Sequence, residues 1–238
     1  MISKQRPAKQ PSWPLALALL VASIVANAGW SGQSRADSDA YAVDPWTVCG
    51  AFIDQAERAL ELPPHLLHAI SKVESGRWDS ARSALSAWPW TVMAEGRGRY
   101  LANKAAAVAE VTALKAQGVR NIDVGCMQVN LQFHPRAFDS LEQAFDPAQN
   151  VAYAATFLTQ LRQETNSWTR AVGRYHSATP HLMGRYRLKV FRAWREEKRE
   201  AERERRAARE ARQETAPAPT SRALGLHLVP TAYHRSPR

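Results

Sequence analysis

The sequence predicts a predominantly helical α+β domain with a small strand element, and three observations support this class. Apolar residues recur at helical spacing in several segments, and residues typical of helix N-caps or first turns precede them. Runs with strand character are few and short. The chain has 238 residues, 45% of them hydrophobic, which suits one ordinary domain with appendages rather than two large domains.

The first two predicted helices cover residues 47–60 and 64–75. The apolar face of the first comprises Val48, Phe52, Ala56 and Ala59. Pro63-Pro64 ends this helix and starts the next, because proline is well suited to a first helical turn. Gly76 follows the second helix, as glycine commonly does at a helix C-terminus. Both helices therefore have sequence-defined ends.

The middle of the chain is less regular. Residues 80–99 contain a Trp-Pro-Trp sequence and two closely spaced glycines, which predict a loop with a short strand near residues 90–93. Residues 119–124 form a second plausible short strand. Three further helices are predicted to begin at the N-cap residues Asn103, Asp146 and Ser167. The predicted folded domain covers residues 45–194.

The N-terminus has the pattern of a secretory signal peptide. Three basic residues precede an apolar run over residues 15–28, which closes with a small-x-small cleavage pattern at Ala28. We expect a signal peptide at 1–28, a polar linker at 29–44 and a periplasmic protein. The alternative is an uncleaved inner-membrane tether. In either case the rest of the chain crosses a membrane, which argues against nucleic acid as a partner.

The C-terminus changes composition. Residues 195–214 are mostly Arg, Glu and Ala with almost no apolar stripe, which predicts a solvated charged helix. Contact of this helix with a membrane or wall polymer is the alternative. Residues 215–238 are rich in Pro and Ala, and we expect them to be disordered. The net charge of +10 favours an anionic partner without identifying it.

The chain has two cysteines, Cys49 and Cys126. In an oxidising compartment they can form one disulfide, and two buried thiols are the alternative. Neither has metal ligands at zinc-site spacing. We therefore expect neither a metal nor any other cofactor.

Glu74 is the candidate catalytic residue. Leu67, Ile70 and Glu74 follow an i, i+3, i+7 series, so they share the face that the helix buries. Burial disfavours the charged carboxylate, and the negative end of the helix dipole acts in the same direction. A glutamic acid with a raised pKa can donate a proton to a leaving oxygen, as glycosidic cleavage requires. On spacing alone, a partly exposed helix-end glutamate beside Ser75 is the favoured interpretation.

Four motifs resemble those of the lytic transglycosylase family with the SLT domain. Residues 73–76, Val-Glu-Ser-Gly, resemble its Glu-Ser-Gly signature, and residues 125–130, Gly-Cys-Met-Gln-Val-Asn, resemble its Gly-Leu-Met-Gln-hydrophobic-Asn motif. Residues 146–150 are similar to its third block, and residues 171–177 stand where the family has Ala-x-x-Tyr-Asn-Ala-Gly. The four occur in the family's order between residues 47 and 194.

This resemblance implies a single goose-type lysozyme-like domain that acts on the glycan strands of peptidoglycan. The implied reaction cleaves the β-1,4 bond between N-acetylmuramic acid and N-acetylglucosamine without water. One glutamate acts first as acid and then as base on the muramic 6-hydroxyl, which closes a 1,6-anhydro ring. The absence of a second motif-matched carboxylate fits this chemistry, whereas most glycosidases use a pair.

The resemblance also assigns roles to residues of this chain. It implies that Glu74 is the catalytic acid and base, and that Ser75 is a polar residue near the reacting sugar. Gln128 would hydrogen-bond the substrate, and Met127 would form an apolar wall, unless it is simply core. Tyr175 would supply the hydroxyl that orients the glutamate.

Some residues depart from the family pattern. Cys126 stands in place of leucine and suggests a link between this loop and Cys49. His176 replaces asparagine, and is either a substrate contact that titrates near neutral pH or a surface histidine. Asn150 fits a helix-start role better than a substrate contact.

Two other functions remain open at this point. A hydrolytic muramidase on the same fold would need a second carboxylate, for which Asp79, Asp123 and Glu95 are candidates without a spacing argument. A non-catalytic wall-binding protein would serve a flagellar, pilus or secretion apparatus. The products formed from peptidoglycan separate these possibilities.

Overall fold

The computed structural model describes residues 44–215 of the chain and confirms the predominantly helical α+β class. Its helices are α1 (Val48–Ala59), α2 (Leu66–Ser75), α3 (Lys104–Ala116), α4 (Leu141–Ala144), α5 (Pro147–Thr165), α6 (Trp168–His176) and α7 (Pro180–Thr215). Its strands are β1 (Gly76–Asp79), β2 (Ala84–Ala87), β3 (Thr91–Ala94), β4 (Arg97–Tyr100), β5 (Ile122–Val124) and β6 (Val129–Asn130). The predicted caps Asn103, Asp146 and Ser167 each accept a hydrogen bond from a first-turn N–H.

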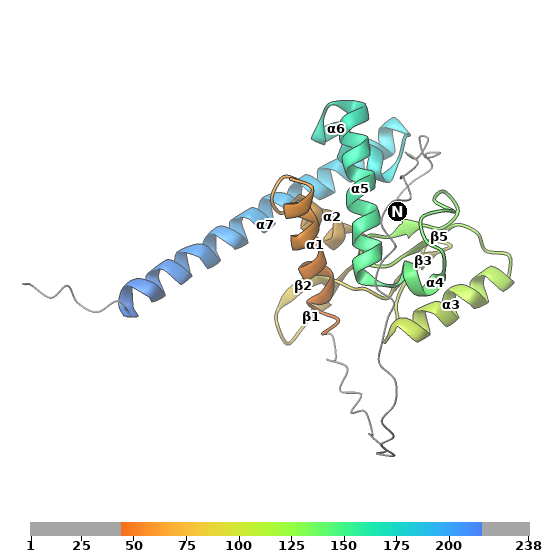
Figure 1. Cartoon of the computed structure of the whole chain (residues 1–238), viewed down its shortest axis with the longest axis horizontal. Helices are drawn as coiled ribbons and strands as arrows, with labels where there is room; N and C mark the ends of the chain where they lie inside the picture. The colour runs from red at the N-terminus through yellow and green to blue at the C-terminus, as the bar shows by residue number, and fades with distance from the viewer. Residues whose placement is uncertain (1–43, 216–238) are drawn as a thin grey trace, which may run out of the picture. The chain divides into compact units, whose positions relative to one another are not determined.

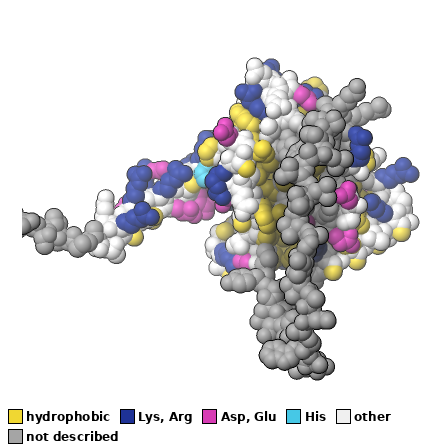
Figure 2. All heavy atoms as spheres, in the orientation of Figure 1, with side chains coloured by type: hydrophobic (Ala, Val, Ile, Leu, Met, Phe, Trp, Pro, Cys, Tyr) yellow, Lys and Arg dark blue, Asp and Glu magenta, His cyan; other side chains and the backbone are white. Residues whose placement is uncertain are grey.

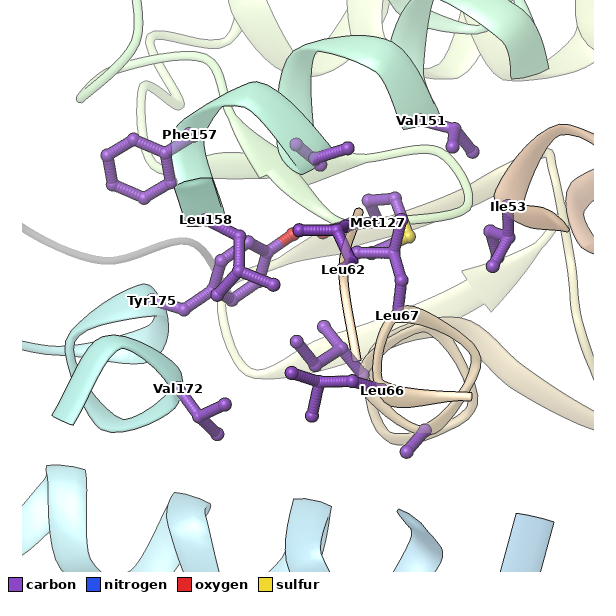
Figure 3. Packing of buried hydrophobic residues seen from close by; sticks show 14 of the residues in the cluster. Ile53, Leu62, Leu66, Leu67, Met127, Val151, Phe157, Leu158, Val172 and Tyr175 are labelled. Carbon is purple, nitrogen blue, oxygen red and sulfur yellow. The ribbon is translucent and has the colours of Figure 1, made fainter. Parts of the chain in front are cut away.

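Helix α5 lies at the centre of the domain, with α1 and α2 on one side and α3, β3 and β5 on the other (Figure 1). It packs against α1 and α6. The main core lies in this helical part, and it includes Ile53, Leu66, Leu67, Val151, Leu158 and Val172 (Figure 3). A second cluster fills the space between β3, β5, α3 and α4, and it includes Val92, Val111, Ile122, Val124 and Phe145.

The strands form two antiparallel units. β1 pairs with β2, and a four-stranded sheet has the order β4-β3-β5-β6. The predicted short strand near residues 90–93 corresponds to β3, but the surrounding residues 80–99, predicted to be a loop, also contain β2 and most of β4. Glu95 and Gly96 both have positive φ and join β3 to β4 in a two-residue hairpin turn. Strand β4 was not predicted because its residues, Arg-Gly-Arg-Tyr, do not alternate between apolar and polar side chains.

A buried glutamate fixes the position of α2. The Glu57 carboxylate of α1 accepts hydrogen bonds from the backbone N–H groups of His65 (2.8 Å) and Leu67 (2.7 Å). A carboxylate suits this place because the first N–H groups of a helix lack intrahelical partners and lie at the positive end of its dipole. This contact anchors the start of α2, and Glu74 lies near the other end of the helix.

Helix α7 combines a packed first half with a charged second half. Tyr186 and Val190 are buried, and the Trp194 indole donates to the Pro64 carbonyl oxygen at 2.8 Å. The charged segment predicted at 195–214 continues this helix instead of starting a new one. Residues 200–215 belong to a separate compact unit, and this part of α7 is an exposed helix that carries both basic and acidic side chains (Figure 2).

Several predictions fall outside the described part of the chain. The expected signal peptide (1–28) and nearly all of the linker (29–44) and of the tail (215–238) lie there, although Thr215 is the last residue of α7. Within residues 44–215, no helix is both long enough and apolar enough to cross a membrane.

Candidate active site

The carboxyl group of Glu74 is held by a tyrosine from α7. The Tyr186 hydroxyl donates a hydrogen bond of 2.6 Å to Glu74 Oε1, while Glu74 itself stays partly exposed. Burial, together with the nearby Glu74 charge, keeps the pKa of Tyr186 well above its ordinary value. The hydroxyl therefore keeps its proton and remains a donor. This hydrogen bond joins α2 to a segment more than 100 residues later in the chain.

His176 supports the tyrosine. Its ring stacks on the ring of Tyr186, with centroids 4.5 Å apart and planes inclined by 5°. The predicted alternatives for His176 were a substrate contact or a surface histidine. The structure instead places this partly buried residue against the side chain that holds Glu74, so its contribution to the site is indirect.

Tyr175 does not orient Glu74, and that prediction is wrong. The residue is fully buried, and its hydroxyl donates to the Met127 carbonyl oxygen at 3.0 Å. Met127 is also fully buried and lies with Tyr175 among the core side chains (Figure 3). Met127 is thus core rather than groove wall. The hydroxyl assigned to Tyr175 is supplied eleven positions later, by Tyr186.

Gln128 and Ser75 also point into the protein, contrary to their predicted substrate contacts. Each is 1% exposed. Gln128 Nε2 donates to the carbonyl oxygens of Thr91 (3.1 Å) and Gly125 (3.0 Å), which ties the loop to β3. Ser75 Oγ donates to the Cys126 carbonyl oxygen at 2.6 Å. Both side chains use their polar atoms to hold the loop at residues 125–130 next to the end of α2.

Asn150 completes the support of this loop. It is fully buried, its Oδ1 accepts from the Met127 N–H at 2.9 Å, and its Nδ2 donates to the Val124 and Ala144 carbonyl oxygens at 3.0 Å. Gly125 has φ of +82°, and a Cβ there would lie 2.4 Å from Asn150 Nδ2. The glycine is required both by its backbone conformation and by this close approach. Asn150 is a structural residue.

Cys49 and Cys126 form a disulfide with Cα atoms 5.9 Å apart. Both residues are buried. The bond joins α1 to the loop whose Cys126 carbonyl accepts from Ser75, directly after Glu74 in the chain. Cys126 stands in place of the family's leucine because it forms this disulfide.

One candidate second carboxylate, Asp123, is a buried acid with a raised pKa. Asp123 is 2% exposed, and its Oδ1 accepts from Asn130 Nδ2 at 2.8 Å. Burial, reinforced by the charge of Glu74, raises the pKa of Asp123 to about 6, although the hydrogen bond from Asn130 opposes this rise. Asp123 is therefore a buried acid within electrostatic range of Glu74.

The other two carboxylates have structural surroundings. Asp79 accepts from the Arg82 guanidinium at 2.6 Å and from the Ala81 N–H at 2.9 Å. The hydrogen bond from Arg82 is the main reason that the pKa of Asp79 is lowered. Glu95 is exposed in the β3–β4 turn, 3.7 Å from the Arg97 guanidinium. Among the described residues, no group of three or more His, Cys, Asp or Glu side chains could hold a metal ion.

The sequence motifs do not predict Tyr186, because the last of the four motifs ends at residue 177. A signal was available in the segment that follows. Tyr186, Val190 and Trp194 recur at i, i+4 and i+8, which is the spacing of a packed helix face. A tyrosine on such a face can be buried and still hold a polar partner with its hydroxyl.

Comparison with known protein families gives one match. A family model described as Transglycosylase SLT domain matches residues 51–189, a segment that contains the end of α2, the loop at 125–130 and Tyr186. No curated protein and no solved structure gives a significant match.

Proposed function

Because the chain belongs to the transglycosylase SLT domain family, whose activity is of the transglycosylase type on peptidoglycan, we propose that it is a lytic transglycosylase with Glu74 as its acid and base. The proposed bond is the β-1,4 link between N-acetylmuramic acid and N-acetylglucosamine. One observation carries this proposal: a partly exposed carboxyl group is held by a buried hydroxyl at 2.6 Å.

In the first step, protonated Glu74 gives its proton to the glycosidic oxygen as the bond from that oxygen to C1 of the muramic residue breaks. This is general acid catalysis. The acetamide of the same sugar stabilises C1, in place of a second enzyme carboxylate. Tyr186 keeps the carboxyl group oriented in this step.

In the second step, the ionised Glu74 takes the proton of the muramic 6-hydroxyl as its oxygen bonds to C1. The product is a 1,6-anhydro sugar, and Glu74 is protonated again for the next cycle. No water is consumed. Tyr186, which stays neutral because of its raised pKa, donates to the carboxylate while the negative charge is present.

A hydrolytic muramidase is the second candidate, and Asp123 is the observation that favours it. Most glycosidases use two carboxyl groups, and Asp123 would be the second beside Glu74. However, Asp123 is almost fully buried and hydrogen-bonded to Asn130. This position suits an acid that tunes the charge of the site better than one that must activate water, so we favour the transglycosylase.

Digestion of purified peptidoglycan sacculi, followed by mass spectrometry of the products, tests the proposal. We expect muropeptides that end in 1,6-anhydro-N-acetylmuramic acid, lighter by one water than the hydrolysed forms. Products with reducing ends would establish the muramidase instead. Intact sacculi would leave a wall-binding role. The proposed setting for this activity is the periplasm, in line with the predicted export signal.

A further inference from the structure

A concave site that does not include Glu74 lies beside α2. It is a pocket of about 420 Å³ between the start of α1, the middle of α2 and β2. This volume lies within the roughly 300–1,000 Å³ range of small-molecule sites. Its lining includes Trp46, Asp54, His68, Lys72 and Ser86.

The pocket is separate from the glutamate site. His68, Ser71 and Lys72 recur at i, i+3 and i+4 and face the pocket. Neither Glu74 nor Tyr186 lines the pocket. A ligand bound there would leave the catalytic carboxyl group accessible.

The charged groups of the pocket are already paired. His68 Nε2 lies 2.8 Å from Asp54 Oδ1, and Lys72 Nζ lies 2.6 Å from Glu197 Oε1. An anionic ligand would have to displace Asp54 from His68 or Glu197 from Lys72, and a cationic ligand would have to displace His68 or Lys72. A neutral ligand with hydroxyl and amide groups can hydrogen-bond to these polar atoms without breaking either pair.

The remaining walls suit the flat, weakly polar face of a sugar. Trp46 supplies an aromatic surface, and its ring is itself fixed by an edge contact with Trp88 (centroids 4.8 Å apart) and by the Arg77 guanidinium 5.1 Å from its centroid. A ring held on other sides is preorganised for a ligand. Gly50, which also lines the pocket, leaves space there, since His68 Cε1, at 3.6 Å, is the atom that a Cβ at Gly50 would contact.

We propose that this pocket binds a neutral N-acetylhexosamine residue of a glycan strand, as a second glycan site distinct from the one at Glu74. The inference rests on the proposed glycan substrate but not on the cleavage chemistry. Trp46 stacks on the sugar face, and the Asp54–His68 pair and Ser86 bind its hydroxyl and amide groups. The site holds a strand on the enzyme independently of the bond that is cleaved.

The test uses the full chain with Glu74→Gln, so that no substrate is consumed, and a tetramer of N-acetylglucosamine as the probe. Binding is followed by NMR at the Trp46 indole and the His68 imidazole. We expect both signals to shift on titration. In a second variant, Ala51→Phe fills the pocket from its exposed rim, and we expect the affinity reported by these signals to fall by about tenfold or more.

Ala59→Phe is the matched control, because Ala59 is also an exposed alanine of α1 but does not line the pocket. It should bind as the parent does. Unmoved signals at saturating tetramer, or equal affinity in Ala51→Phe, would overturn the proposal. A shift with a free stem tripeptide but not with the tetramer would overturn the sugar assignment. Because binding is measured without cleavage, failure of the proposed reaction and failure of this site give different results.

Discussion

The end of α2 and the loop at residues 125–130 meet in the same place, yet they use their polar groups in opposite ways. Glu74 remains partly exposed, and its carboxyl group accepts a hydrogen bond from the buried Tyr186 hydroxyl of α7. In the loop, Gln128 and the backbone of Met127 are turned inward and bonded to β3, α5 and α6. In the proposed function, the first region carries out the chemistry and the second holds the first in place.

This difference in the use of polar groups affects how a polar residue in a family motif is interpreted. A buried polar group costs free energy unless it is hydrogen-bonded. A buried loop next to an active site therefore needs polar side chains that form hydrogen bonds with its buried backbone groups. A glutamine or asparagine in a family motif can be fixed for that reason alone. The two roles can be separated by substitution, since loss of support should lower stability and loss of chemistry should lower rate.

Loss of Asn150 should have the largest effect on stability. Asn150→Ala removes three buried hydrogen bonds and leaves the Met127 N–H without a partner, so we expect a loss on the order of 4 kcal/mol in the free energy of unfolding. Urea denaturation measures it. Gln149→Ala, at the exposed neighbouring position, should change it by no more than about 0.5 kcal/mol. Equal effects of the two substitutions would contradict the supporting role of Asn150.

The disulfide should come next. Its cysteines are 77 residues apart, and bonds that close loops of this length typically contribute about 2–4 kcal/mol. The double variant Cys49→Ala/Cys126→Ala should therefore unfold at a lower urea concentration, as should the wild-type protein in the presence of a reductant. An unchanged midpoint in the double variant would show that the loop is held without the bond.

Two tyrosine substitutions compare the regions most closely. Tyr186→Phe removes a hydrogen bond to a carboxylate, worth roughly 1.5–3 kcal/mol, and should slow sacculus digestion by about 10- to 100-fold. Tyr175→Phe removes a hydroxyl of equal size from the loop support and should cost about 1 kcal/mol of stability with little change in rate. If Tyr175→Phe slowed the reaction as much as Tyr186→Phe, the division of roles would be wrong.

Asp123 should give a smaller, pH-dependent effect. Its pKa is about 6 in the folded protein and about 4 when unfolded, so the folded state binds the extra proton between these values. Its contribution is favourable below pH 4 and declines as pH rises to 6, by on the order of 2 kcal/mol. Asp123→Asn should therefore gain stability relative to wild type between pH 4 and pH 7. A difference that is constant over this range would contradict the raised pKa.

The sequence predicted much of the fold, since caps and apolar spacing are local signals. Asn103, Asp146 and Ser167 begin helices as expected. Strand β4 was not predicted because its pairing with β3, rather than its own composition, determines its strand conformation. For the proposed site, the directions of the side chains around Glu74 were not predicted, since Ser75, Met127, Gln128 and Tyr175 are buried. Whether Gln128 faces a sugar or the Thr91 carbonyl depends on contacts between distant segments, and a motif does not reveal the direction of a side chain.

The most direct test of the account is the rate at which Glu74→Gln releases soluble muropeptides from sacculi. Glutamine keeps the shape of the side chain and can accept from Tyr186, but it cannot deliver a proton. We expect the rate to fall by about 10³-fold or more, with the melting temperature unchanged and sacculus binding retained. Release at the wild-type rate by a folded Glu74→Gln protein would contradict the assignment of the acid and base to this residue.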